Sequence, residues 1–413
     1  MAGGEERARE RYRILEDELG EKGISIAEVT RRIRDFEVEV PSWVFGNFGG
    51  GRFGGFTYPG AATSSFEKIE DAGLVHRLTG ATPRVAIHVG WDKPEDVAFD
   101  DVQCDHFEPL ADKLEAEGLA MGAVNPTLFL EGTQYGSLSS PIDEVRRSLI
   151  RHSVTSGRIA ERFAAGLVTY WLPDGSNYPG QIDLWKAEKR IHDAFDRIMD
   201  ESPDAVRILI EYKLFEPGTY STHVSDWGAA LEIARRFPGR AGVLVDMGHH
   251  AFGVNVPQIV ARLIGLGVPG GFHFNSRYAA DDDHSVEPNR EMFAIFNELA
   301  AGGVIGSGDP AKDWAYMIDQ CSSLENRIEA VLHTVDSLML SYARALILDR
   351  ARLAALQAEE LTIQANREFL AAMLTDVRPI LAVARMEKDL PADPVAAYVA
   401  SGYQDKINAE RRT

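Results

Sequence analysis

The sequence is poor in cysteine and in positive charge, and each shortage excludes a class of protein. Its two cysteines, Cys104 and Cys321, cannot build a disulfide framework or a cysteine-rich zinc site, and they fit a reducing compartment. Lysine and arginine number 43 against 63 aspartate and glutamate residues, so the net charge is −20. Nucleic-acid binding depends on basic side chains that neutralise phosphates. We therefore expect no nucleic-acid partner.

Two further absences concern membranes and nucleotides. No run approaches the roughly 18 apolar residues that span a bilayer, and the charged N-terminus lacks the apolar stretch of a signal peptide. We expect a cytoplasmic protein without a membrane partner. The glycine-rich segment 46–56 has neither the Gly-Lys-Ser/Thr ending of a P-loop nor a GxGxxG that opens a helix. We expect an aromatic lid there, because glycine supplies conformational freedom and phenylalanine supplies apolar contact.

Short apolar runs alternate with helical patterns along most of the chain. This alternation predicts parallel strands joined by right-handed helical crossovers, hence an α/β protein. Eight such units closing as a (β/α)8 TIM barrel fit residues 36–324, with 37–45 as the first strand and 84–92 as the second. Residues 1–35 predict two helices before the barrel. Residues 325–413 predict a helical extension, which contacts a neighbouring subunit or packs back on its own barrel.

Residues able to bind metal recur at the ends of the apolar runs 206–213, 241–249 and 270–275. The carboxyl ends of the strands hold the active site in a (β/α)8 barrel. With later acidic residues, the candidate ligands are Glu211, Asp246, His249, His273, Asp281, Asp283 and Asp319. Such a set, with few nitrogens and no thiolate, favours Mn²⁺, Mg²⁺ or Co²⁺ over a structural zinc. Any one of these aspartates alone would fit a helix cap or a solvated turn. The metal site is favoured because three successive apolar runs each end at a residue able to bind metal.

The second predicted strand carries His88, followed by Trp91. A histidine on an apolar strand is often a core residue that is satisfied by a hydrogen bond. The tryptophan beside it also suits the wall of a sugar pocket, because a flat apolar ring offers a large rigid contact surface. Both interpretations of His88 remain open at this point.

Eight motifs taken together carry a family resemblance that covers most of the chain. They are Pro41-Ser-Trp43, Ile87-His88-Val-Gly-Trp91-Asp, Tyr170-Trp171-Leu-Pro-Asp-Gly-Ser-Asn-Tyr-Pro-Gly-Gln181, Glu211-Tyr-Lys213, Asp246-Met-Gly-His249-His, His273-Phe-Asn275, Asp281-Asp-Asp283 and Asp319. The chain resembles the broad-specificity bacterial L-rhamnose isomerases of the xylose-isomerase-like barrel superfamily. The resemblance implies a Mn²⁺-dependent homotetramer that interconverts aldoses and ketoses, with Co²⁺, Mg²⁺ or Zn²⁺ as other candidate ions.

The resemblance also assigns the site residues. It implies that a first metal is held by Glu211, Asp246, His273 and Asp319, and that a second is joined by His249, Asp281 and Asp283. The pocket residues would be Trp43, Phe53, His88, Trp91, Trp171, Lys213 and His249. Phe53 lies in the loop whose aromatic residue reaches a neighbouring subunit's pocket in this family, although the loop is longer and richer in glycine here.

Aldose–ketose isomerisation moves a hydrogen between C1 and C2 and a proton between O1 and O2. Lys213 would then form a hydrogen bond with O1, and Asp319 would relay the hydroxyl proton that moves between O1 and O2. A hydride shift is favoured over an enediol route, since no carboxylate of the set is clearly spare. For Lys213 the alternative is a salt bridge to Glu211 or to another carboxylate. A metal-dependent endonuclease and a non-catalytic sugar-binding protein are the rival functions. The negative net charge disfavours the first, and the second needs no pair of metal sites.

Overall fold

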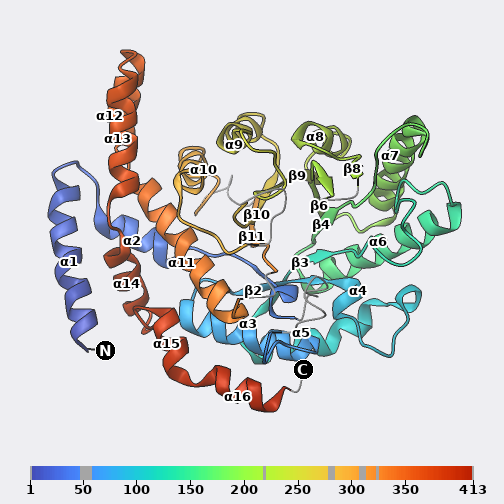
Figure 1. The fold of residues 1–413 in the computed structure, drawn as a ribbon, viewed down its shortest axis with the longest axis horizontal. Helices are drawn as coiled ribbons and strands as arrows, with labels where there is room; N and C mark the ends of the chain where they lie inside the picture. Colours follow the sequence, from blue (N-terminus) through green and yellow to red (C-terminus); the bar gives the residue numbers. More distant parts are fainter. Residues whose placement is uncertain are drawn as a thin grey trace.

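The computed structural model describes residues 2–46, 58–216, 220–277, 284–306, 313–321 and 325–411. Eight parallel strands form one sheet in the order β1-β2-β3-β4-β6-β9-β10-β11 (Figure 1). Their bounds are β1 Val40–Pro41, β2 Arg84–His88, β3 Ala120–Asn125, β4 Leu167–Trp171, β6 Arg207–Glu211, β9 Ala241–Asp246, β10 Gly270–Phe274 and β11 Trp314–Ile318. A parallel bridge between Glu39 and Met317 brings the first and last strands together. The predicted barrel is thereby confirmed.

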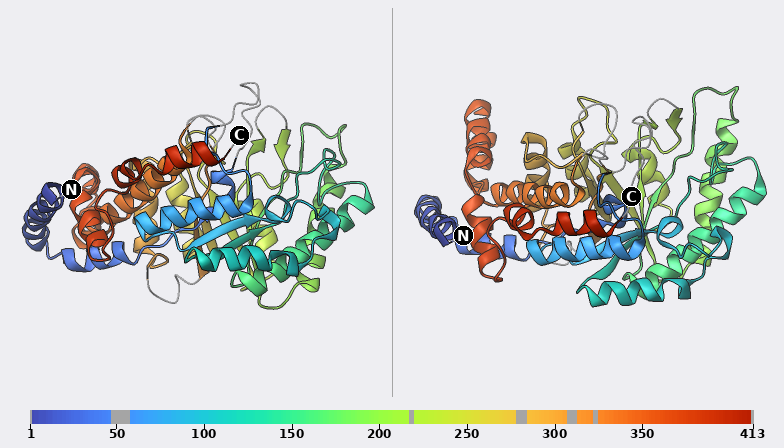
Figure 2. Two further views of the ribbon diagram at one scale, coloured as in Figure 1. Left: turned by 90° about the horizontal axis from the view of Figure 1, so that it is seen from below. Right: turned by 60° about the horizontal axis from the view of Figure 1, so that its bottom comes forward.

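Helices follow the strands and surround the barrel (Figure 2). They are α3 Ser65–Thr79, α5 Glu108–Ala116, α6 Asp143–Phe163, α7 Leu184–Glu201, α8 Trp227–Ala234, α9 Val256–Gly265, α10 Arg290–Ala301 and α11 Arg327–Leu346. The eighth place is taken by α11, which packs against α10 and α3. Shorter elements are η1 Ser42–Phe45, α4 Val89–Asp92, η3 Phe99–Asp101, η4 Cys104–Phe107, and the small antiparallel sheet of β5 Gly175–Ser176, β7 Phe215–Glu216 and β8 Tyr220–Thr222.

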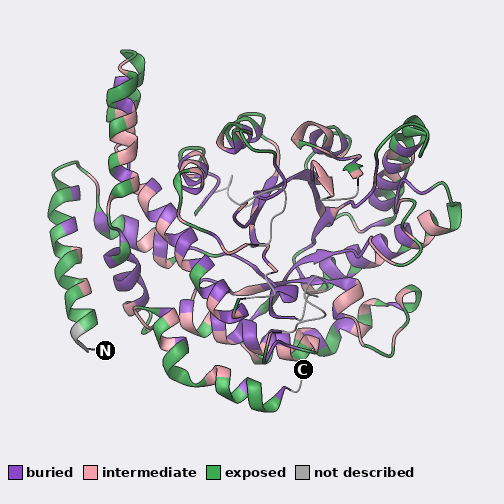
Figure 3. Ribbon diagram, in the orientation of Figure 1, coloured by how far each residue is buried: buried purple, intermediate pink, exposed green. Residues whose placement is uncertain are grey.

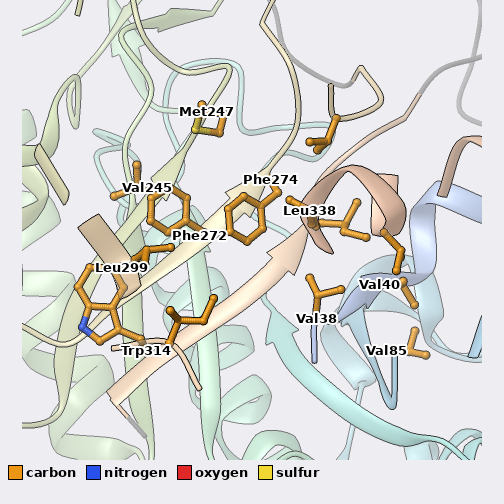
Figure 4. Packing of buried hydrophobic residues seen from close by; sticks show 14 of the residues in the cluster. Val38, Val40, Val85, Val245, Met247, Phe272, Phe274, Leu299, Trp314 and Leu338 are labelled. Atoms are coloured by element: carbon orange, nitrogen blue, oxygen red, sulfur yellow. The ribbon is translucent and has the colours of Figure 1, made fainter. Parts of the chain in front are cut away.

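Alternate residues along each strand belong to two different cores. Phe272 and Phe274 face outwards and pack with Leu299 of α10 and Leu338 of α11 between the sheet and the helices (Figure 4). The other face of the strands fills the barrel interior with Trp43, Ala86, Ala123, Leu167, Leu209, Leu244 and Met317. Because side chains alternate with a period of two, residues two positions beyond this interior layer also point inwards, at the carboxyl end of the barrel.

Two predicted strands were wrong at their ends. The first strand ends at Pro41, where proline cannot donate to the ladder, and Ser42–Phe45 form a 3₁₀ helix. The second ends at His88 and is followed by the one-turn helix α4. Asp92 accounts for this turn, because its carboxylate accepts hydrogen bonds from the His88 amide at 3.0 Å and the Ser42 hydroxyl at 2.5 Å. Such side-chain bonds compete with the strand ladder.

The terminal segments are helical, as predicted. Before the barrel lie α1 Ala2–Gly20 and α2 Ile26–Arg34, and α14 Arg378–Met386 packs against both. The last helices, α15 Pro394–Ser401 and α16 Tyr403–Glu410, lead to Arg411, whose buried guanidinium donates to Asp71 of α3 at 2.6 Å. These parts of the extension therefore pack on their own chain.

The helices α12 Arg350–Ala358 and α13 Thr362–Leu374 pair with each other and project from the molecule, largely exposed (Figure 3). Ile363 and Leu374 of this hairpin are 73% and 76% exposed. Within the described residues, no single helix is long and apolar enough to cross a membrane. Taken together, α11 and α12 reach that length and apolar composition, but they form a pair bent by 62°.

Gly122 on β3 leaves room for a buried carboxylate inside the barrel. Glu39 accepts hydrogen bonds from the Ala123 amide at 2.8 Å and from Arg84 at 3.1 Å, and a Cβ on Gly122 would collide with it. We expect Gly122→Ala to lower the free energy of unfolding by about 1–3 kcal/mol, the usual cost of overpacking. Gly265→Ala, at the end of α9 with open space around it, serves as the control and should be neutral or stabilising.

Urea unfolding followed by circular dichroism checks this expectation. A Gly122→Ala protein with the midpoint of the wild type would show that Glu39 moves aside without cost.

Candidate active site

Four potential metal ligands meet at the carboxyl end of the barrel. Glu211 ends β6, Asp246 ends β9, His273 lies on β10 and Asp319 follows β11. Glu211, Asp246 and Asp319 come two residues after Leu209, Leu244 and Met317 of the interior layer, so the strand period turns them inwards. One ligand atom from each of the four lies within 4.8 Å of the others. We call these four residues the acid cluster.

The imidazole of His273 lies among the three carboxylates. Its Nδ1 is 3.1 Å from Glu211 Oε1, 3.6 Å from Asp319 Oδ2 and 3.7 Å from Asp246 Oδ2. Burial lowers the pKa of His273, but the charges of Glu211, Asp319 and Asp246 outweigh burial and raise it to about 9. The site therefore attracts positive charge, and three oxygen donors with one nitrogen fit a divalent cation.

Hydrogen bonds from neighbouring groups orient the carboxylates of the cluster. Asp246 is fully buried and accepts from the Asn275 amide group at 3.0 and 3.1 Å and from the Gly248 backbone at 2.7 Å. The indole of Trp43 donates to Asp319 Oδ1 at 2.9 Å. Such supporting bonds hold ligands in place before an ion binds.

His249 lies beside the acid cluster. Its Nδ1 is 3.0 Å from the Tyr212 carbonyl oxygen and 3.3 Å from Glu211 Oε1. The phenol of Tyr212 bonds His250 at 2.7 Å, which fixes the turn after β9 to the end of β6. The other two candidate ligands of a second metal, Asp281 and Asp283, lie outside the described residues, as does Phe53 of the predicted lid.

A cavity of about 260 Å³ opens above the acid cluster. Rings line one side of it: the aromatic wall consists of Trp43, His88, Trp91, Phe129 and Trp171. Ring centroids lie 4.0 Å apart for His88 and Trp91 and 4.9 Å apart for Phe129 and Trp171. The polar lining includes Asn125, Lys213, Glu216, His249 and Cys321. Flat rings beside a few fixed polar groups form a site for a small molecule.

The structure brings together six of the seven predicted pocket residues, since all but Phe53 line this cavity. Sequence reasoning missed Asn125, Phe129, Glu216 and Cys321. Asn125 carried a signal, because it ends the strand-like run 119–125 as Glu211 ends its own run. Phe129 carried none, since it lies in a loop without periodicity.

The two sides of the cavity come from different halves of the barrel. The aromatic wall is supplied by the chain from η1 to β4, and the acid cluster by the chain from β6 to the residue after β11. The strands run in this order around the barrel, so each side is contiguous.

Lys213 projects into the cavity from the segment after β6. Its ammonium is 3.4 Å from Glu216 Oε2 and 5.6 Å from the ring centroid of Trp171. The side chain is 9% exposed, so the charge is largely removed from water. The Glu216 carboxylate is therefore within ion-pair distance, as the salt-bridge interpretation of Lys213 requires. The ammonium also reaches the cavity, as the substrate-binding interpretation requires.

A parallel eight-stranded barrel with a buried acid cluster and an aromatic pocket at its carboxyl end has the layout of barrel enzymes, which keep their active sites at that end. The sequence profile of the L-rhamnose isomerase (RhaA) family matches residues 8–372. The chain belongs to the L-rhamnose isomerase family, which confirms the resemblance in its motifs.

Individual relatives agree with this assignment. A probable sugar isomerase of Rhizobium meliloti (strain 1021) is 39% identical over 411 residues, which cover 97% of this chain and 92% of the relative. The L-rhamnose isomerase of Pectobacterium carotovorum subsp. carotovorum (strain PC1) is 29% identical over 271 residues, or 62% of this chain and 63% of that one. The crystal structure of the IolI protein with a bound zinc atom shares the fold, with 14% identity, a TM-score of 0.50 and coverage of 75% and 99%.

Proposed function

We propose that this protein is a metal-dependent aldose–ketose isomerase that converts L-rhamnose to L-rhamnulose and acts on related sugars such as D-allose and D-allulose. The observation that carries the proposal is the acid cluster beneath an aromatic wall in a member of this family. Rings suit the apolar faces of a sugar, while carboxylates, Lys213 and Asn125 suit its hydroxyl groups.

We further propose two divalent cations, with Mn²⁺ as the expected metal. The acid cluster would hold the first, and its closely spaced donors and the carboxylate charges that raise the pKa of His273 fit that role. His249 would join the second together with Asp281 and Asp283. When bound, such ions supply Lewis-acid stabilisation of the charge that develops on sugar oxygens.

The residues of the chain would bind the sugar and move its hydroxyl proton. Lys213 would donate a hydrogen bond to O1 and stabilise negative charge there. Asp319, with one oxygen held by the Trp43 indole, would accept and return the proton that moves between O1 and O2. Among the described residues that line the pocket, Glu216 carries the one carboxylate outside the acid cluster. Its Oε2 lies 3.4 Å from the Lys213 ammonium, so this carboxylate is engaged in an ion pair. We therefore favour a direct hydrogen shift from C2 to C1 over abstraction of a proton by a carboxylate.

We also propose a homo-oligomer, with a tetramer as the expected state, and a cytoplasmic location. The support is the projecting α12–α13 hairpin, whose exposed Ile363 and Leu374 offer apolar surface to another subunit. Sedimentation of the intact protein, compared with an Ile363→Glu variant, tests the assembly.

The function is tested by stripping the protein with EDTA, restoring Mn²⁺ and measuring ketose formation from a panel of aldoses. We expect turnover to disappear with EDTA, to return with Mn²⁺, and to be fastest with L-rhamnose. Sugar binding without turnover under any divalent metal would instead support a non-catalytic sugar-binding protein. Epimer formation without ketose would support an epimerase.

A further inference from the structure

Behind the aromatic wall, three buried residues form a chain of hydrogen bonds that leads away from the cavity. His88 Nδ1 is 2.8 Å from the hydroxyl of Thr127, and the backbone amide of Thr127 donates to His152 Nε2 at 3.0 Å. Thr127 is 0% exposed, and His152 and His88 are 5% and 8% exposed. Neither Thr127 nor His152 lines the cavity above the acid cluster.

The hydroxyl of Thr127 has one hydrogen to donate and accepts a bond from the Gly90 amide at 2.9 Å. Within the described part of the chain, the one acceptor within reach of that hydrogen is His88 Nδ1. Gly90 makes the approach feasible, because a Cβ at this position would collide with Thr127. The hydroxyl hydrogen thus points at Nδ1, so Nδ1 carries no proton.

His88 is neutral, because burial lowers its pKa to about 3 and Asp92 offsets this only in part. A neutral imidazole whose Nδ1 accepts a bond must carry its proton on Nε2. Among the described residues, no protein group pairs with Nε2, and His88 lines the cavity. The ring therefore presents an N–H donor to whatever occupies the cavity.

We propose that Thr127 is a positioning residue that fixes His88 as its Nε2–H tautomer, so that His88 donates a hydrogen bond to a substrate oxygen. His152 supports this arrangement by holding the Thr127 backbone, and its ring is fixed in turn by stacking on Phe99 at 4.1 Å. The inference deepens the proposed function and rests on it for the identity of the oxygen, which would belong to a sugar. The Nε2–H tautomer requires a substrate oxygen that accepts a hydrogen bond from His88. The other tautomer would instead require a substrate hydroxyl that donates to Nε2.

The direct test is the protonation of His88 in the intact protein loaded with diamagnetic Mg²⁺. Solid-state NMR of histidine-labelled protein distinguishes protonated from unprotonated ring nitrogens, and a His88→Asn variant assigns the signal. We expect a protonated Nε2 and an unprotonated Nδ1 in the wild type. In Thr127→Val, which has nearly the same shape without the hydroxyl, we expect the other tautomer to appear, while Thr127→Ser keeps the wild-type signal.

Kinetics on the same preparations provide the second measurement. A donor that bonds the substrate equally before and during the reaction affects KM and leaves kcat unchanged. We expect Thr127→Val to raise KM about tenfold, the loss of about one hydrogen bond, with kcat within about twofold of the wild type. Thr127→Ser should restore KM. Thr79→Val, which removes a buried hydroxyl bonded to the Val75 carbonyl oxygen, is the matched control.

A protonated Nδ1 in the wild type would overturn the proposal, and this measurement decides the matter even if Thr127→Val fails to fold. An unchanged tautomer in Thr127→Val would also overturn it. A changed tautomer with an unchanged KM would overturn the role of His88 towards substrate. Failure of the wild type to convert any aldose would refute the proposed function instead, without altering the NMR result.

Discussion

Asp246→Asn is expected to empty the acid cluster and to lower turnover by more than about 100-fold, since changes to groups that merely support a metal ligand already cost 10–100-fold. Asparagine keeps the shape of the side chain but removes one of the three carboxylate charges that the site offers to a cation. Asp246 is fully buried, lies 3.7 Å from His273 Nδ1 and accepts a hydrogen bond from the Asn275 amide, so its carboxylate is held directly at the site. His273→Ala should have the same effect, because it removes the nitrogen donor.

Metal content per chain, measured by mass spectrometry after gel filtration, checks this expectation together with the melting temperature. Mn²⁺ should raise the melting temperature of the wild type, because a ligand that binds only the folded state stabilises it, and it should raise that of Asp246→Asn far less. Asp226→Asn is the control, because Asp226 caps α8 on the surface and asparagine caps a helix equally well. Two ions retained per chain in Asp246→Asn would contradict the assignment.

Lys213→Met should lower kcat by about 10²–10³-fold while KM changes little, because a charge that stabilises O1 acts mainly in the transition state. Methionine retains the length of the side chain and its contact with Trp171 but removes the ammonium. Both metals should stay bound, since Lys213 is no ligand. The exposed pair of Lys186 with Asp183 offers the control Lys186→Met, for which we expect wild-type kinetics.

A purely structural role for Lys213 gives the opposite pattern. The ion pair with Glu216 would then be the main contribution of the lysine, so Lys213→Met and Glu216→Gln would lower the melting temperature by similar amounts. Residual turnover of the folded fraction of Lys213→Met would stay close to that of the wild type. Melting, metal content and kcat measured on one preparation separate these outcomes, and a near-normal kcat would exclude the catalytic role.

The barrel and the candidate ligands at its strand ends could be predicted because both depend on local regularities, whereas the grouping of four of these ligands into the acid cluster was implied by the family resemblance. The apolar runs showed where the strands lie, and the period of two showed that Glu211 and Lys213 share a face. The ends of the first two strands could not be predicted in this way. The first ends at Pro41, a residue that the expected strand ran through. The turn after the second depends on Asp92, whose carboxylate meets Ser42, a residue 50 positions earlier in the chain.

The same limit applies to the surroundings of His88. The sequence did not decide whether His88 is a core histidine or a pocket residue. The structure shows features of both, because the ring is buried and hydrogen-bonded to Thr127, and one side of it lines the cavity. Thr127 and His152 carry no motif, and their role depends on distances across separate loops and helices.

The aromatic wall is encoded before residue 172, and the acid cluster after residue 206. A single genetic crossover within α7 would therefore exchange the wall and leave the four ligands together on one inherited fragment. Chimeras of this chain with its Rhizobium meliloti relative, joined in that helix, would carry the relative's wall segment over this chain's ligand set. Recombination could in this way change which sugar is accepted without rebuilding the centre on which the chemistry depends.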